Sequence, residues 1–121
     1  SNNVFVLNNY AYYLSIRNTR LEKAKEMSFR CNQLAPDNGT YQDTYAWILY
    51  SLKEYKKAKE WMLKALLNGG GNSAVIVEHY GDILYRLGDR EAALDQWKKA
   101  KELGGSSQFL NQKIKEEKLY E

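Results

Sequence analysis

The 121-residue chain has few of the residues that cross-link, kink or bind metal: one cysteine, one proline and one histidine. A single cysteine excludes an internal disulfide, and a single histidine leaves no ligand set for a zinc site. No apolar run is long enough to span a bilayer, which needs about 18 residues or more. We therefore expect no metal site and no membrane insertion.

The charge balance is also modest, with 18 basic and 15 acidic residues giving a net charge of +3. This excess is too small to demand an anionic partner. Aromatic residues are the distinctive component: ten tyrosines, three tryptophans and three phenylalanines. Tyrosine is amphipathic and suits half-buried ridges and contact surfaces. The length is that of a single domain, which we place at residues 1–121.

A short pattern recurs at a spacing of 35 residues: a tyrosine, a small residue, two variable residues and a leucine. It occupies residues 10–14, 45–49 and 80–84. A period of this size indicates stacked supersecondary units rather than one globular core. Such arrays mostly act by presenting a surface and not by housing a reaction.

Each unit contains two segments with helical periodicity, separated by a turn. The third unit shows this most clearly, with apolar or small residues at three- and four-residue steps: Val77, Tyr80, Gly81 and Leu84, then Ala93, Trp97 and Ala100. We predict an all-α helix-turn-helix solenoid with repeats at about 4–38, 39–73 and 74–107. A capping helix is expected at about 108–120, because Lys115 stands where the small residue of a further unit would belong.

The small residues of the pattern have a physical role. Ala11, Ala46 and Gly81 would allow the two helices of each unit to approach closely. The facing small residues would be Ala24, Ala58 and Ala93.

These features resemble the tetratricopeptide repeat family, in which a large–small pair on the first helix is followed by alanines and an aromatic on the second. The first unit fills the same roles with Leu7, Tyr10, Ala11, Leu14, Ala24, Cys31 and Pro36. The resemblance implies a right-handed superhelical arc and a protein-interaction module rather than an enzyme. In general impression it is nearest to bacterial repeat proteins, of which this chain would be a fragment.

The resemblance also implies a concave groove, lined by the first helices, that binds an extended peptide or a helix. The repeat register assigns nine residues to this groove: Asn8, Tyr12, Ser15, Asp43, Trp47, Tyr50, Glu78, Asp82 and Tyr85. They are mostly aromatic, acidic or amide-bearing. We expect a protein or peptide partner that is basic or carries proline or aromatic side chains.

One ligand of the family is not expected. Chaperone-binding members hold a C-terminal carboxylate with a clamp of lysines, asparagines and an arginine. The matching positions here contain no lysine or arginine: Asn8, Tyr12, Thr44, Val75 and His79. The sequence therefore predicts a groove without the carboxylate clamp.

Catalytic chemistry has little support. Cys31 falls in a core-facing column without a basic partner, which indicates packing. His79 has no companion ligands for a metal. The glycines at 69–71 lack the lysine and hydroxyl residue of a phosphate-binding loop, so they indicate a turn. We predict no catalytic residues and no cofactor.

Two other functions stay open. The chain could be the end of a longer array or a self-associating scaffold, because Val4, Phe5 and Val6 leave the N-terminal end apolar. A homo-oligomer could then form through this face. The lysine-rich second helices could instead serve as a nucleic-acid-binding accessory. This is the less favoured reading, because glutamates such as Glu54 and Glu60 interleave with the lysines.

Overall fold

The computed structural model describes residues 3–105 and 107–121, and these form α-helices and one short 3₁₀ turn, with no strand among them. The helices are α1 (Val4–Ile16), α2 (Leu21–Leu34), α3 (Gly39–Ser51), α4 (Tyr55–Leu67), α5 (Ala74–Arg86), α6 (Arg90–Glu102) and α7 (Leu110–Glu116); the 3₁₀ turn η1 is Gly70–Asn72. No helix in these ranges is both long and apolar enough to cross a bilayer.

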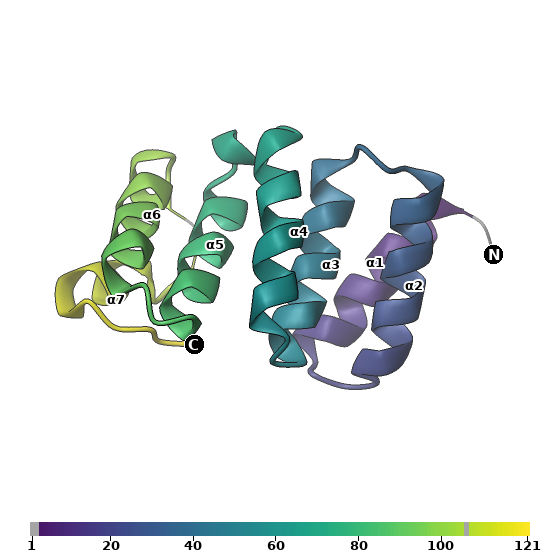
Figure 1. The fold of residues 1–121 in the computed structure, drawn as a ribbon, viewed down its shortest axis with the longest axis horizontal. Coiled ribbons are helices and arrows are strands. Elements are labelled where there is room, and N and C mark those ends of the chain that lie inside the picture. Colours follow the sequence, from purple (N-terminus) through teal and green to yellow (C-terminus); the bar gives the residue numbers. More distant parts are fainter. Residues whose placement is uncertain (1–2, 106) are drawn as a thin grey trace.

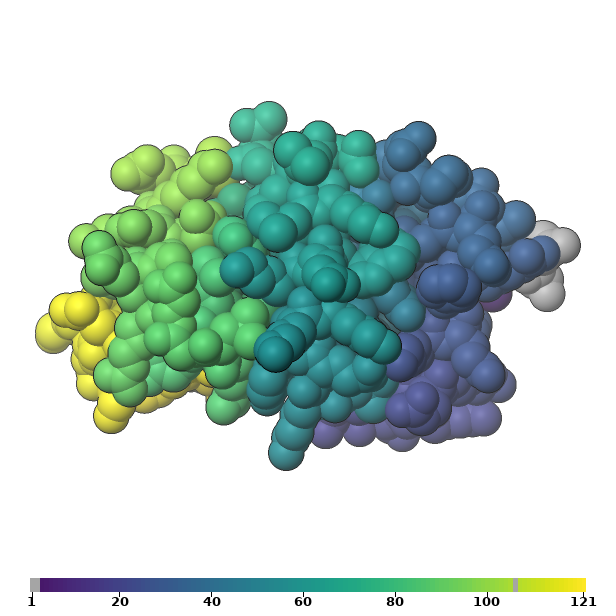
Figure 2. All heavy atoms as spheres, in the orientation of Figure 1, coloured from purple at the N-terminus to yellow at the C-terminus, as the bar shows by residue number. Residues whose placement is uncertain are grey.

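The helices pack as successive pairs along the long axis of the molecule (Figure 1). Within each pair, α1 lies on α2, α3 on α4 and α5 on α6, and each pair contacts the next. On the face shown in Figure 2 the chain runs in order from the N-terminal to the C-terminal end. The predicted all-α helix-turn-helix solenoid is confirmed.

The first helix of each pair begins with the same local signal. Asn3, Asn38 and Ser73 are N-caps whose side chains accept hydrogen bonds from backbone N–H groups three residues later, at 3.1, 3.0 and 3.3 Å. Such caps satisfy donors that a helix start would otherwise leave unpaired. Because the caps are spaced 35 residues apart, the same interval as the tyrosine pattern, the pairs start in register.

The small residues lie at the helix crossings. The alanines among them have no accessible surface: Ala11, Ala46, Ala24, Ala58 and Ala93. At the third crossing only glycine fits. A Cβ on Gly81 would lie 2.5 Å from Cδ1 of the Trp97 indole. Trp97 is itself fully buried, so it has no room to move aside.

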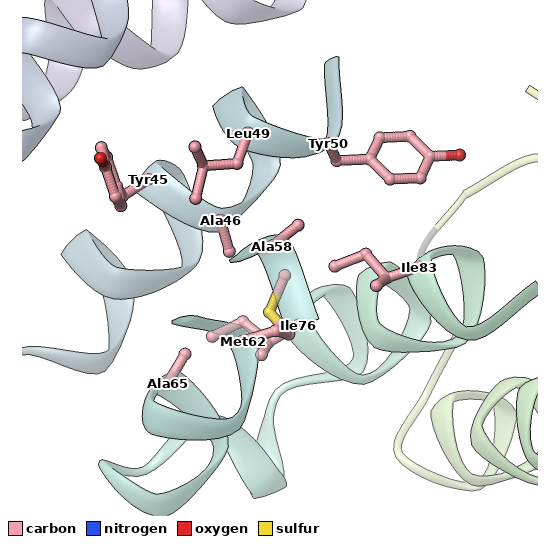
Figure 3. Close-up of a cluster of buried hydrophobic side chains, with 9 residues drawn as sticks. All are labelled: Tyr45, Ala46, Leu49, Tyr50, Ala58, Met62, Ala65, Ile76 and Ile83. Carbon is pink, nitrogen blue, oxygen red and sulfur yellow. The ribbon is translucent and has the colours of Figure 1, made fainter. Parts of the chain in front are cut away.

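The buried clusters include residues from neighbouring pairs. The cluster in Figure 3 combines residues of α3, α4 and α5. Ile76 and Ile83 of α5 pack with Met62 and Ala65 of the preceding α4. Burial of these side chains joins neighbouring pairs, as expected for a solenoid in which each unit covers the next.

The last helix, α7, covers part of the segment in which we expected a capping helix. It ends at Glu116; the next residue, Glu117, has a left-handed φ of 54°, and the Lys118 N–H then donates to the carbonyl of Lys113. Lys115 is exposed, whereas Lys113 is 2% exposed and points into the molecule. The buried lysine of α7 is therefore Lys113, and not Lys115, which the repeat register places at the position of the small residue.

We predict that Gly81→Ala destabilises the protein by about 1–3 kcal/mol, because the added methyl group overlaps the buried indole of Trp97. Urea denaturation of the purified variant measures the effect. Gly71→Ala is the matched control, since its Cβ would meet only the Leu66 carbonyl oxygen, at an ordinary 3.6 Å. Equal stability of the two variants would show that the crossing has room for a side chain.

Candidate functional site

The nine residues assigned to the groove lie on α1, α3 and α5, and six of them line two adjoining hollows. The N-terminal hollow has a volume of about 330 Å³ and is lined by Asn8, Asn9, Tyr12, Thr40, Asp43, Thr44, Ser73, Val75 and Ile76. The C-terminal hollow has about 300 Å³ and is lined by Trp47, Val75, Glu78, His79, Asp82, Ser107, Phe109, Lys113, Tyr120 and Glu121. Ser15, Tyr50 and Tyr85 line neither hollow.

Few of these nine side chains are accessible. Tyr12 is exposed, at 45% of its surface, and Trp47 and Tyr85 are half-buried. The other six are buried: Asn8, Ser15, Asp43, Tyr50, Glu78 and Asp82. The accessible part of the predicted site is therefore aromatic, and its polar residues are mostly engaged within the protein.

Trp47, which lines the C-terminal hollow, is held in an aromatic stack. Its ring centroid lies 3.8 Å from that of His79 on α5 and 4.4 Å from that of Tyr50 on its own helix, with nearly parallel planes. Tyr85 stacks at 5.8 Å on Trp97. Part of each ring is thus used for packing between helices, which leaves Tyr12 as the least constrained aromatic side chain of the nine.

Polar residues pair across successive first helices at nearly the repeat spacing. Asp43 on α3 lies 2.9 Å from Nδ1 of His79 on α5, and Glu78 on α5 lies 2.7 Å from Nζ of Lys113 on α7. The corresponding place on α1 is held by Asn8, whose Oδ1 is buried with no hydrogen-bond partner among the described residues. Thr44 on α3 has the register of His79, but it donates its hydroxyl to the Thr40 carbonyl instead of to Asn8. We call these the cross-helix pairs.

The Asp43–His79 pair changes the proton affinity of the imidazole. Burial lowers the pKa of His79, but the adjacent carboxylate of Asp43, together with those of Asp82 and Glu78, more than offsets this effect, so the pKa is raised above its usual value. Protonation of His79 consequently compensates the charge of Asp43 between α3 and α5.

Lys113 sits at the centre of the other buried polar network. Its ammonium group donates to Glu78 Oε2 at 2.7 Å and to Asp82 Oδ1 and Oδ2 at 2.9 and 3.2 Å. It also lies 5.8 Å from the centroid of the Trp97 ring, whose N–H donates to Asp82 at 3.0 Å. Burial raises the pKa of Asp82 to about 6, although Lys113 opposes the shift. One ammonium group thus satisfies two buried carboxylates.

Glu78 also binds the residues that precede α7. The backbone N–H of Ser107 donates to Glu78 Oε1 at 3.0 Å, and the Ser107 hydroxyl donates to Oε2. Because Ser107 and Lys113 flank the start of α7, both ends of this stretch are tied to α5. The C-terminal segment, residues 107–121, therefore packs against one end of the predicted groove.

The end of the C-terminal segment returns to α3 and α5. The hydroxyl of Tyr50 donates to Glu121 Oε2 at 2.9 Å, and Arg86 forms an ion pair with the same carboxylate. Arg86 Nε also contacts the Tyr50 hydroxyl at 3.4 Å. Burial raises the pKa of Tyr50 well above its usual range, so its hydroxyl stays a donor. The Tyr50 hydroxyl is therefore used to hold the end of the C-terminal segment.

The sequence did not reveal the residues that pair with the acidic side chains, namely Lys113 and His79. Nor did it reveal the ion pair between Arg86 at the end of α5 and Glu121. A signal was present. His79 follows Asp43 by 36 residues and Lys113 follows Glu78 by 35, which is close to the repeat spacing. Opposite charges one repeat apart on adjacent first helices are candidates for direct contact.

The arrangement gives no sign of catalysis in the part of the chain that the structure describes. Burial raises the pKa of the Cys31 thiol, so the nucleophilic thiolate is disfavoured. No group of three or more His, Cys, Asp or Glu side chains is placed to hold a metal ion within residues 3–105 and 107–121.

We predict that His79, the only histidine, titrates with a pKa above 6.5 and that Asp43→Asn lowers this value, because burial then acts without the carboxylate. The stabilisation from the pair is complete below pH about 6.5 and is lost as the pH rises through the folded-state pKa. NMR titration of the imidazole measures both values. Asp95→Asn on the exposed side of α6 serves as control, and an Asp43→Asn pKa equal to that of the control contradicts the pairing.

We predict that Lys113→Met costs about 3–5 kcal/mol, because it leaves Glu78 and Asp82 buried without their cation. Chemical denaturation at neutral pH checks this. Lys115→Met, on the exposed side of the same helix, should change stability by no more than about 0.5 kcal/mol. Similar losses in the two variants would mean that the buried ammonium group has no special role.

No protein-family model and no curated protein matches the sequence. Solved structures do match. The Sgt2 TPR domain from Aspergillus fumigatus is 17% identical, with a TM-score of 0.83 over 94% of this chain and 76% of that one. The first TPR of Spaghetti (RPAP3), bound to the HSP90 peptide SRMEEVD, is 14% identical, with a TM-score of 0.83 over 94% and 89%.

The Arabidopsis OM64 TPR domain gives a similar result: 16% identity and a TM-score of 0.84 over 95% of this chain and 93% of that one. At such low identities the likeness concerns the backbone and not the ligand. The chain has the fold of tetratricopeptide repeat domains.

Proposed function

We propose that this chain is a non-enzymatic protein-interaction module that binds a peptide or a partner protein along its first helices. The observation that carries the proposal is the N-terminal hollow, which has a volume of about 330 Å³ and is lined by the exposed aromatic side chain of Tyr12. Aromatic side chains at the centre of such surfaces are common binding hot spots. A domain of the same fold, the first TPR of Spaghetti, binds an HSP90 peptide.

The charge of the groove argues for a ligand read mainly by its apolar and aromatic side chains. Three carboxylates face the site, but Asp43 is paired with His79, and both Glu78 and Asp82 are paired with Lys113. A basic ligand gains little unless it competes with these partners. The ligand we propose carries proline or aromatic side chains that stack on Tyr12, with any positive charge placed beside Asp43.

We further propose that the module lacks a carboxylate clamp. Of the five matching positions, Val75 is apolar and the Thr44 hydroxyl bonds within its own helix. Asn8 is buried, and His79 already pairs with Asp43. A ligand carboxylate would meet no free cation at these places.

We predict that Tyr12→Ala weakens the peptides selected from a peptide array by about tenfold or more, because the stacking surface is removed. Fluorescence anisotropy with the selected peptides measures the affinities. Tyr13→Ala is the matched control, since this tyrosine is equally exposed but lines neither hollow.

Two results would contradict the proposal. Unchanged affinity in Tyr12→Ala would place binding outside the N-terminal hollow. Tight binding of the acidic peptide SRMEEVD that is lost on Asn8→Ala would show that a clamp exists after all.

A further inference from the structure

The carboxylate of the Glu121 side chain is held by two donors that α3 and α5 supply. The Tyr50 hydroxyl donates a hydrogen bond to Glu121 Oε2 at 2.9 Å, and the Arg86 guanidinium pairs with the same carboxylate. Arg86 Nε also donates to the Tyr50 hydroxyl at 3.4 Å. This contact joins the two helices directly, so the two donors are linked to each other independently of Glu121.

The position of the Tyr50 hydroxyl is fixed by packing. Tyr50 is 6% exposed, and its ring packs on those of Trp47 and Tyr55 at centroid distances of 4.4 and 5.5 Å. Its hydroxyl points away from the other labelled side chains of the cluster in Figure 3. A hydroxyl donor beside a guanidinium is well suited to a carboxylate. Tyr50 and Arg86, which we call the carboxylate subsite, are therefore preorganised for an acidic side chain.

The carboxylate subsite adjoins the C-terminal hollow. Tyr120 and Glu121 line this hollow of about 300 Å³ together with Trp47 and His79. Val75 lines both this hollow and the N-terminal one. Tyr120 and Glu121 thus lie where a peptide that follows the first helices from the N-terminal hollow would continue.

Residues 117–121, which we call the strap, are held more loosely than α7. The side chains of Arg86 and Glu121 are 41% and 42% exposed, whereas that of Lys113, which anchors α7, is 3% exposed. Leu119 of the strap is only partly buried, against the cluster of α5 and α6. An exposed ion pair contributes little to stability, while a buried one is costly to break. The strap can therefore leave while α7 stays docked.

We propose that the strap is an internal ligand that a partner peptide displaces, and that the carboxylate subsite then takes an acidic side chain of the partner. The strap itself indicates the partner's chemistry, because Glu121 fills the subsite and Tyr120 lines the adjoining hollow. The partner carries an aromatic residue next to a glutamate or aspartate. The inference rests on the proposed function only in taking a peptide as the ligand, since it concerns the opposite end of the groove from Tyr12.

A second copy of the chain is a less suitable occupant. It would bring the same five residues, which each copy already binds within itself at a high local concentration. Exchange of straps would form no new contact, yet it would cost the freedom of two independent chains. A peptide longer than the strap can add contacts in the C-terminal hollow, where Trp47, Val75 and Phe109 supply apolar surface.

The test uses the sequence of residues 115–121 as a synthetic peptide with both ends blocked, and the full chain with Glu121→Gln as its receptor. We expect the peptide to shift the NMR signal of the Trp47 indole N–H. Its affinity for this variant should be at least about tenfold higher than for the natural chain, in which Glu121 competes for the subsite. Equal affinity for the two chains, or no binding to the variant at about 10 mM peptide, would overturn the proposal.

Two matched controls isolate the carboxylate. Glu117→Gln removes the same charge from an exposed residue of the strap and should leave the affinity at that of the natural chain. A peptide with glutamine in place of the glutamate of position 121 should bind the Glu121→Gln chain at least about tenfold more weakly. Peptides that bind equally well with and without this carboxylate would contradict the subsite.

A change in the subsite itself locates the binding. Arg86→Met, added to the Glu121→Gln chain, should weaken the peptide by at least about tenfold, because it removes the cation. Arg86 is exposed, so circular dichroism should show an unchanged fold. Undiminished binding would place the peptide elsewhere. Tyr12→Ala should leave this binding unchanged, so failure of the subsite and failure of the proposed binding at Tyr12 are separate results.

Light scattering distinguishes the other occupant. We expect the natural chain and the Glu121→Gln chain to be monomers, because exchanged straps add no contact. A dimer of the natural chain that is lost on Arg86→Met would make a second copy the occupant of the subsite and would overturn the assignment to a partner peptide.

Discussion

The buried ammonium group of Lys113 is the interaction on which the C-terminal half of this molecule depends. Two carboxylates, Glu78 and Asp82, lie almost out of reach of water and share this one cation. Isolated buried charges are very costly, so these helices pack closely only with Lys113 in place. The raised pKa of Asp82, about 6, shows that burial still outweighs the attraction of the lysine at this carboxylate.

Pairing of this kind also sets the charge of the two hollows. Their carboxylates would make a negative surface if they were free, but Lys113 and His79 compensate them from within the chain. The C-terminal segment then closes over one hollow, held by Tyr50 and Arg86 through Glu121. At the opposite end, Tyr12 is exposed beside the N-terminal hollow, which Asn8 and Asn9 also line. Position in the array, more than residue type, therefore determines which aromatic side chain is available.

The fold could be predicted from the sequence because its signals are local and repeated. Three small residues at one spacing set the helix crossings, and three N-caps at the same spacing set the helix starts. The site could be predicted only as a set of positions. Whether Asp82 faces a ligand or a lysine depends on a side chain from another helix, here Lys113 of α7. The sequence analysis used only Lys115 of that helix, as a sign of a capping helix, and two residues along a helix a side chain lies on a different face.

The two ends of the array differ in kind, and this difference follows from the cross-helix pairs. At the C-terminal end the last pair is complete, since Glu78 receives Lys113 and α7 turns a polar side outward. At the N-terminal end, the exposed side of α1 carries Val6, Tyr10 and Tyr13, and the helix has no charged residue. Residues with the same register, such as Ile48 and Ile83, are buried at the internal joints. Within the described solenoid, the last helix is therefore charged on its outer side, whereas the first helix is apolar there.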